Sequence, residues 1–142
     1  MEPLFPDLQS ALSASGIVRL SALEKSAIND LLFKQFPFTG SFPNWSMTKN
    51  HQSTYQPFAS LVEAHFSDFF ATCLSGRPDD LVYYANDGVA LAFKGMRTAF
   101  QANLAAFVDV PHTSYFMATD GSWCMTLRMN GEMDWGESMT ER

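Results

Sequence analysis

Three glycine-containing turn signals divide the second half of the chain into short segments. They are N-D-G at residues 86–88, T-D-G at 119–121 and N-G at 130–131. Asn-Gly and Asp-Gly pairs readily adopt the positive backbone angles that a two-residue hairpin turn requires. Because a hairpin joins antiparallel strands, these signals predict a mainly antiparallel sheet.

The segments beside these turns have the length and composition of strands. In the stretch S-W-C-M-T-L-R, Trp123, Met125 and Leu127 would share one face of a strand. The five predicted strands are L-V-Y-Y-A (81–85), V-A-L-A-F (89–93), S-Y-F-M-A (114–118), S-W-C-M-T-L-R (122–128) and E-M-D-W-G (132–136).

Helical patterns dominate the first half of the chain. Ser21 and Glu24 form a capping box, in which each side chain can bond a free amide at the start of a helix. Apolar residues recur at helical spacing between Pro57 and Leu74, with seven of them expected to point inward: Phe58, Leu61, Val62, His65, Phe66, Phe69 and Cys73. The predicted helices cover about 5–13, 21–35, 57–74 and 94–107.

This order of elements predicts the fold class. Helices come first, followed by a hairpin, a further helix and a three-stranded meander. We therefore expect residues 1–142 to form a single α+β domain. It should contain an antiparallel sheet of about five strands, with three to four helices packed mainly on one face.

Residues 36–54 form the one long segment that fits neither periodic pattern. Pro and Gly punctuate it, while Phe38, Phe42 and Trp45 provide bulk. A loop of this length is uncommon inside a compact domain and is often functional. Trp45 is therefore a candidate aromatic anchor for a partner. The alternative is that these rings only pin the loop to the core.

Composition and charge limit the class of protein. Apolar residues make up 46% of the chain and charged residues 17%, which is typical of a globular protein. The 15 acids and nine Lys and Arg give a formal charge of −6. The chain has no cluster of basic residues, which argues against a nucleic-acid partner, and its negative charge favours encounter with a basic protein.

The sequence predicts a cytoplasmic protein that does not associate with membranes. No apolar run approaches the length of a membrane span, and the first residues lack the features of a signal peptide. Cys73 and Cys124 show no C-x-x-C spacing. We expect them to be free, buried thiols in a reducing compartment.

No motif for catalysis, nucleotide binding or metal binding is present, so we expect no catalytic residue, no cofactor and no metal. His65 and Asp68 could share one side of a helix as an acid–base or metal pair. Because His65 lies on the apolar stripe, a half-buried, hydrogen-bonded histidine is the favoured interpretation. His51 and His112 are expected in surface loops.

Acidic residues surround Trp135 near the end of the chain. Glu132 and Asp134 should point to the same side of the last strand and could bind a metal or transfer a proton, but the sequence shows no third ligand. The favoured interpretation is that they protect a sheet edge and offer a surface to a basic partner. The predicted partner-contact residues are Asp79, Asp80, Asp87, Glu132, Asp134, Trp135, Glu137 and Trp45.

Four stretches between Leu81 and Gly136 carry a resemblance to a known group of proteins. They are L-V-Y-Y-A-N-D, the aromatic-containing F-K-G-M-R-T-A-F-Q-A-N-L-A-A-F, S-Y-F-M-A-T-D-G-S-W and M-N-G-E-M-D-W-G. In spacing and residue type this region is similar to small acidic immunity proteins of bacterial polymorphic-toxin systems. It departs from them in its helix, where that group often carries Trp and this chain has Phe100 and Phe107.

The resemblance implies a non-enzymatic inhibitor that binds a cognate toxin and occludes its active site or substrate groove. Many toxin domains are nucleases with basic clefts, which an acidic surface could occupy. Two alternatives remain open. One is a small enzyme with a pocket between helices and sheet, using His65 or the Glu132–Asp134 pair. The other is a subunit of a larger assembly that uses exposed Phe residues.

Overall fold

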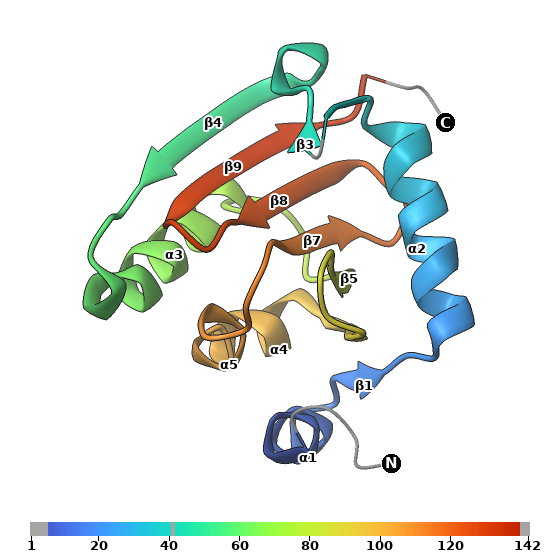
Figure 1. Ribbon diagram of the computed structural model, residues 1–142, viewed down its shortest axis with the longest axis vertical. Coiled ribbons are helices and arrows are strands. Elements are labelled where there is room, and N and C mark those ends of the chain that lie inside the picture. Colours follow the sequence, from blue (N-terminus) through green and yellow to red (C-terminus); the bar gives the residue numbers. More distant parts are fainter. Residues whose placement is uncertain (1–5, 41, 140–142) are drawn as a thin grey trace.

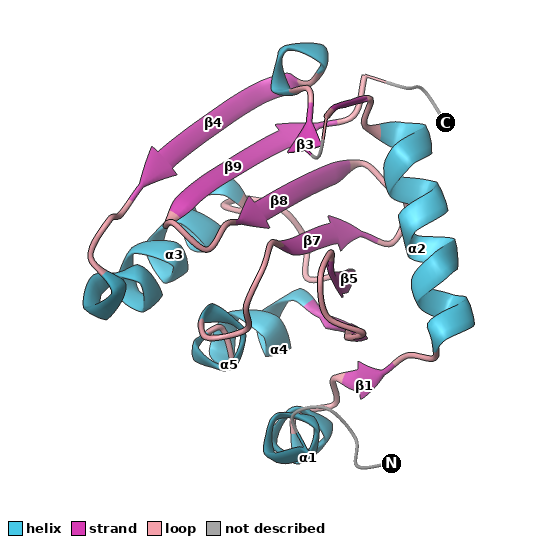
Figure 2. Cartoon of the chain, viewed as in Figure 1, coloured by secondary structure: helices cyan, strands magenta, loops and turns pink. Residues whose placement is uncertain are grey.

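A seven-stranded antiparallel sheet forms the framework of the computed structural model, which describes residues 6–40 and 42–139. Its strand order is β1-β6-β5-β7-β8-β9-β4 (Figures 1 and 2). The strands are β1 (Val18–Arg19), β4 (Lys49–Tyr55), β5 (Leu81–Asn86), β6 (Ala92–Met96), β7 (Ser114–Ala118), β8 (Trp123–Leu127) and β9 (Glu132–Glu137). A separate hairpin joins β2 (Phe38–Thr39) to β3 (Phe42–Pro43). The sheet thus contains strands near all five predicted positions and two more, but β6 starts at Ala92 rather than 89 and takes in Lys94 to Met96, which were expected to begin a helix.

The predicted hairpins form where the turn signals lie. β8 and β9 pair around the Asn-Gly turn, and Gly131 has a φ of 92°. A Cβ atom at this position would overlap the carbonyl oxygen of Gln56, so the turn needs glycine for its backbone angle and for this close crossing.

Helices lie on both faces of the sheet, but four of the five that the structure describes pack on the same face, which agrees with the expectation of packing mainly on one face. The helices are α1 (Pro6–Ala14), α2 (Ala22–Gln35), α3 (Ala59–Cys73), α4 (Arg97–Ala102) and α5 (Ala105–Val108). Those described thus number five rather than three to four, because the helix expected at 94–107 divides into α4 and α5. Ile28, Leu32 and Phe36 of the α2 segment pack against Tyr115 and Cys124, opposite the face that α3, α4 and α5 cover.

The sequence carries the reason for this second covered face. All five residues of β7 and all five of β8 are buried, so neither strand has a side left for solvent. A strand that is apolar in both directions needs a layer on each face. The capping box of Ser21 and Glu24 forms as predicted and starts the helix that supplies the second layer.

Aromatic rings fill the larger core between the sheet and helices α3 to α5. Phe116 of β7 stands at its centre, with five ring neighbours at centroid distances of 5.1–5.9 Å: Phe66, Phe70, Tyr84, Phe100 and Phe107. All six side chains are fully buried. The many Phe residues therefore act mainly as core.

Residues 49–54, expected to belong to a long loop, form the edge strand β4 together with Tyr55 instead. Figure 1 shows β4 running along the outer side of β9. The sequence K-N-H-Q-S-T-Y is polar in both directions and lacks the apolar alternation that identifies a strand. Because β9 lies inside the sheet, its acids do not protect an edge, which corrects that interpretation.

Among the residues that the structure describes, none of the helices combines the length and apolar character that crossing a membrane requires.

We expect Phe116→Ala to lower the free energy of unfolding by about 3–5 kcal/mol, because it opens a cavity at the meeting point of five rings. Chemical denaturation followed by circular dichroism measures this loss. Leu23→Ala is the control, since Leu23 is 81% exposed on α2 and should change stability by no more than about 0.5 kcal/mol. Similar losses for both variants would contradict this view of the core.

Candidate functional site

The three acids of β9 each contact a base, and they lie on two different faces of the sheet. Glu132 pairs with Arg128 and Asp134 with His51, both on the α2 side. Glu137 alternates to the opposite side, where Arg77 and Asn50 donate hydrogen bonds to its two carboxylate oxygens. Glu132 and Glu137 are therefore each paired with an arginine and Asp134 is hydrogen-bonded to His51, so the three acids do not form one bare acidic surface.

The contacts of Glu137 also shift its acidity. Burial acts to raise the pKa of this carboxyl, but the hydrogen bonds from Asn50 and Arg77, with the charges of Arg77 and Lys49, outweigh it and hold the pKa below its ordinary value of 4.5. Glu137 is thus a charged anchor that ties β9 to the start of β4 and to the segment after α3.

The sequence predicts Trp135 at a partner-contact surface, but the structure places it in the core. It is 2% exposed, stacks on Trp123 with ring centroids 5.1 Å apart, and is covered by the guanidinium of Arg77 at 5.2 Å from its ring. A cation over an indole face is attractive, so Arg77 joins Trp135 and Glu137 into one packed unit. Trp135 is therefore unavailable for contact in this structure.

Trp45 and His51 form a pairing that the sequence did not predict. Their rings stack with centroids 5.4 Å apart and an interplanar angle of 4°, and Nε2 of His51 lies 3.0 Å from a carboxylate oxygen of Asp134. Trp45 also covers Gly136, where a Cβ atom would lie only 3.0 Å from the indole. Trp45 thus secures its segment to the sheet while remaining partly exposed.

The remaining predicted acids lie at turns, where backbone amides hold them. Asp79 accepts hydrogen bonds from the amide and the hydroxyl of Thr98 near the start of α4, and these bonds lower its pKa, with the amide bond the largest cause. Asp80 accepts from the amide of Leu81. Asp87 accepts from the amide of Thr113.

Strand direction separates the predicted acids into two groups. The register pairs Asn86 with Ser114, Ser114 with Leu127, and Leu127 with Met133. Asp87 and Glu132 consequently lie at one end of the sheet. Asp79, Asp80 and Glu137 lie at the opposite end, where those strands begin or finish.

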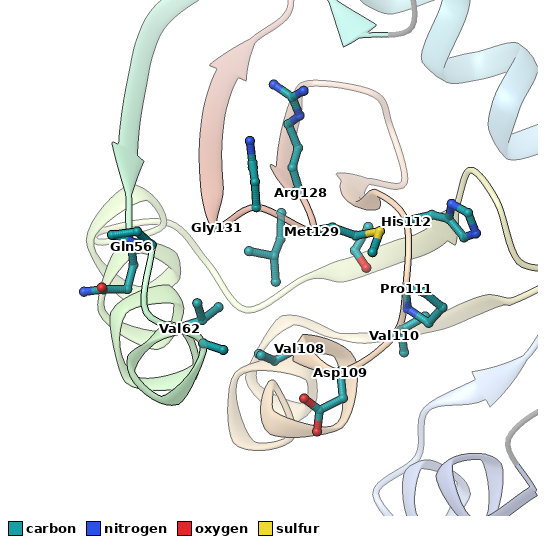
Figure 3. A pocket seen from close by; sticks show the side chains of 15 residues that line it. Gln56, Val62, Val108, Asp109, Val110, Pro111, His112, Arg128, Met129 and Gly131 are labelled. Carbon is teal, nitrogen blue, oxygen red and sulfur yellow. The ribbon is translucent and has the colours of Figure 1, made fainter.

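A groove of about 340 Å³ opens at the end that holds Asp87 and Glu132 (Figure 3). It lies between the β4–α3 connection, the end of α5 and the β8–β9 turn. Val62, Val108 and Leu127 are among its apolar lining residues, and Asp109 and Asn130 are among its polar ones. Figure 3 shows Asp109 projecting outward from the end of α5. A second, smaller hollow shares His112, Arg128, Met129 and Asn130 with this groove and includes Asp87.

A buried hydrogen-bond network makes one wall of the groove rigid. The Asn86 carboxamide oxygen accepts from the amides of Gly88 and Val89, and its nitrogen donates to the carbonyl of Pro111 at 2.7 Å. His112 adopts a φ of 68° and packs against Gly88, where any Cβ would overlap the imidazole. The groove is therefore shaped before any ligand arrives, which reduces the entropy lost on binding.

Four large apolar side chains are exposed on the segments that form this groove, and we call them the apolar rim; of the four, Met129 lines the groove itself. They are Tyr55 (56% exposed), Phe58 (64%), Leu61 (50%) and Met129 (72%). Phe58 and Leu61 were predicted to face inward. Phe58 instead precedes the first turn of α3 as its N-cap residue, and the buried stripe of the helix runs through Phe66, Phe69, Phe70 and Cys73. The predicted helical spacing is confirmed, but the buried face of α3 begins later in the helix than the sequence suggested.

Acidic side chains flank the apolar rim. Glu63 on α3 and Asp109 after α5 are exposed and have no hydrogen-bond or ion-pair partner within the described part of the chain. Neither α3 nor α5 contains Lys or Arg. Sequence reasoning missed both residues because single acids on helices usually mark only a solvated face.

His65 and the cysteines have structural environments. His65 is half-buried, with Nε2 2.7 Å from the hydroxyl of Thr54, as expected. Cys73 and Cys124 are free and buried, and burial raises the pKa of the Cys73 thiol to about 11. Across residues 6–40 and 42–139, no three His, Cys, Asp or Glu side chains gather in a way that could hold a metal ion.

No protein-family model and no curated protein matches this chain.

We expect Glu137→Gln to lower the free energy of unfolding at pH 7 by roughly 1 kcal/mol, because it removes the charge that Arg77 and Asn50 solvate. The folded-state pKa lies below the ordinary value, so this stabilisation is present above about pH 4.5 and is lost as the pH falls through the folded pKa. The two proteins should therefore converge in acid. Denaturation at several pH values measures this, with the unpartnered Glu63→Gln as control; a pH-independent difference would contradict it.

Proposed function

We propose that this chain is a non-enzymatic binding protein that inhibits a protein partner. The resemblance of residues 81–136 to immunity proteins suggests the partner's class, a cognate bacterial toxin. The observation that carries the proposal is the rigid groove with its apolar rim and flanking carboxylates at one end of the sheet.

The apolar rim has the composition of the centre of a protein–protein interface. Specific interfaces combine a desolvated apolar or aromatic core with a polar, charged surround. Tyr55, Phe58, Leu61 and Met129 supply large side chains already at the surface. The groove that Met129 lines can accept a projecting side chain from the partner.

The charges near the rim suit a basic partner. Glu63 and Asp109 are unpaired within the described residues, while Asp87 and Glu132 are held in place by Thr113 and Arg128. A formal charge of −6 attracts a cationic surface over long range, and Glu63, Asp87 and Asp109 would orient it on arrival. The proposed contact surface therefore retains Asp87 among the acids predicted from the sequence. It places less weight on Asp79, Asp80, Glu132, Asp134 and Glu137, which lie at the other end or inside local pairs.

The apolar rim is tested with the protein domain encoded by the neighbouring reading frame. We expect a 1:1 complex in which that domain loses its toxic activity. Phe58→Ala and Met129→Ala should each raise the dissociation constant at least about tenfold, because truncating an anchor at an interface centre commonly costs about 2 kcal/mol. Calorimetric titration measures this, and Leu23→Ala on α2 is the matched control. The proposal fails if no complex forms, or if the control weakens binding as much as the rim variants.

The acidic surround is tested by reversing charge. Asp109→Lys should slow association with the same domain roughly threefold at low salt, and the difference should shrink as salt screens the charges. Asp30→Lys makes the same change on exposed α2 and should have a smaller effect. Stopped-flow fluorescence gives both rates. Equal slowing by the two variants would mean that net charge alone, and not this surface, steers the encounter.

A further inference from the structure

The two edges of the sheet differ in length and exposure. At one edge β1 has only two residues. At the other, β4 has seven residues, and all except Thr54 are exposed. Within the described part of the chain β4 pairs only with β9, so its outer edge is free. A free edge presents backbone donors and acceptors that another strand can use.

The register identifies the backbone groups that point outward from β4. The amide of Gln56 donates to the carbonyl of Gly131, which makes this a hydrogen-bonded pair. Hydrogen-bonded and non-bonded pairs alternate along an antiparallel ladder, so Thr54 and Gln52 also face β9. The backbone amides and carbonyls of Ser53 and Tyr55, and the carbonyl of His51, therefore point away from the sheet, while the amide of His51 lies within the register shift.

Edge protection covers only the first part of the strand. A register shift lies between Lys49 and Gln52, and Asn50 has a φ of 56°. A bulge and a lysine both discourage pairing there. From His51 to Tyr55 the strand contains no proline, no Asp or Glu and no Lys or Arg. Pro57 then prevents pairing beyond this stretch.

Local charge does not oppose the approach of a second copy. Glu132 and Glu137 beside β4 pair with Arg128 and Arg77, Asp134 is hydrogen-bonded to His51, and Lys49 of β4 supplies a third positive charge. Although the whole chain carries −6, the surroundings of the free edge are close to neutral. The repulsion between two copies is consequently long-range, and salt screens it.

We propose that two copies of this chain pair through the β4 edges, antiparallel and centred on Ser53. Because Asn50 and Pro57 limit pairing on either side, residues 51–55 are available for it. The middle residue of this segment is Ser53. This register matches His51 of each copy with Tyr55 of the other, so all three outward-facing residues find backbone partners. The tyrosine ring then adds to the existing Trp45–His51 stack.

Exposed apolar side chains at both ends of the edge support the same arrangement. Met47, 48% exposed, lies just before β4, while Tyr55 and Phe58 lie at its other end. Antiparallel pairing brings the Met47 end of one copy beside the Phe58 end of the other. A two-fold axis repeats this contact, as an isologous interface requires.

This inference is independent of the proposed toxin partner, although Tyr55 and Phe58 belong to both surfaces. Sedimentation of the purified chain alone tests it. We expect a monomer–dimer equilibrium with a dissociation constant below about 1 mM, and a stronger dimer at higher salt. Ser53→Pro should raise the constant at least about tenfold, because it removes an outward amide while the ladder to β9 stays intact. Ser53→Ala keeps that amide and should dimerise like the parent.

Hydrogen exchange of the unmodified protein gives a readout that does not depend on any variant. The amides of Ser53 and Tyr55 should become protected as concentration rises, while those of the short edge β1 should not. A chain that stays monomeric at concentrations up to about 1 mM would overturn the inference. So would a dimer that survives Ser53→Pro with unchanged edge amides, since another surface would then hold it.

Discussion

The structure depends on burying both faces of β7 and β8. Phe116 and Met125 point into the aromatic core under α3 to α5, while Tyr115 and Cys124 point under α2. Central strands without a polar face can exist only between two layers. That requirement accounts for a helical layer on each face. The connections between helices and strands then lie at the ends of the sheet, and the groove opens at one of these ends.

Strong local signals predicted the parts of the fold that such layers need. The Asn-Gly turn, the capping box at Ser21 and the apolar period of α3 all form as the sequence indicated. β4 could not be predicted in the same way, because Lys49–Tyr55 has no apolar face and is held by hydrogen bonds to β9. Its place in the sheet results from pairing with a strand that is distant in sequence, which a local sequence pattern does not indicate.

The sequence predicted the residue types of the candidate site but not their positions in the structure. Sequence reasoning found acids and aromatic residues, but it could not pair Glu137 with Arg77, sixty positions away, or place Trp135 in the core. Alternation within β9 separates Glu137 from Glu132 and Asp134, and the length of β5 separates Asp79 from Asp87. The groove brings together Val62, Val108 and Met129 from three distant segments, and no spacing rule along the chain connects them.

The internal contacts of the β9 acids affect how this protein associates with other proteins. Charges that are satisfied internally no longer contribute a bare anionic surface, so the edge beside them can approach another strand closely. The net charge of −6 then resides largely in turns and on helices, where Glu63 and Asp109 remain available. Long-range attraction and short-range backbone pairing thereby depend on different groups, although the two surfaces share Tyr55 and Phe58. Salt weakens the first and favours the second, so ionic strength separates the two modes of association in solution.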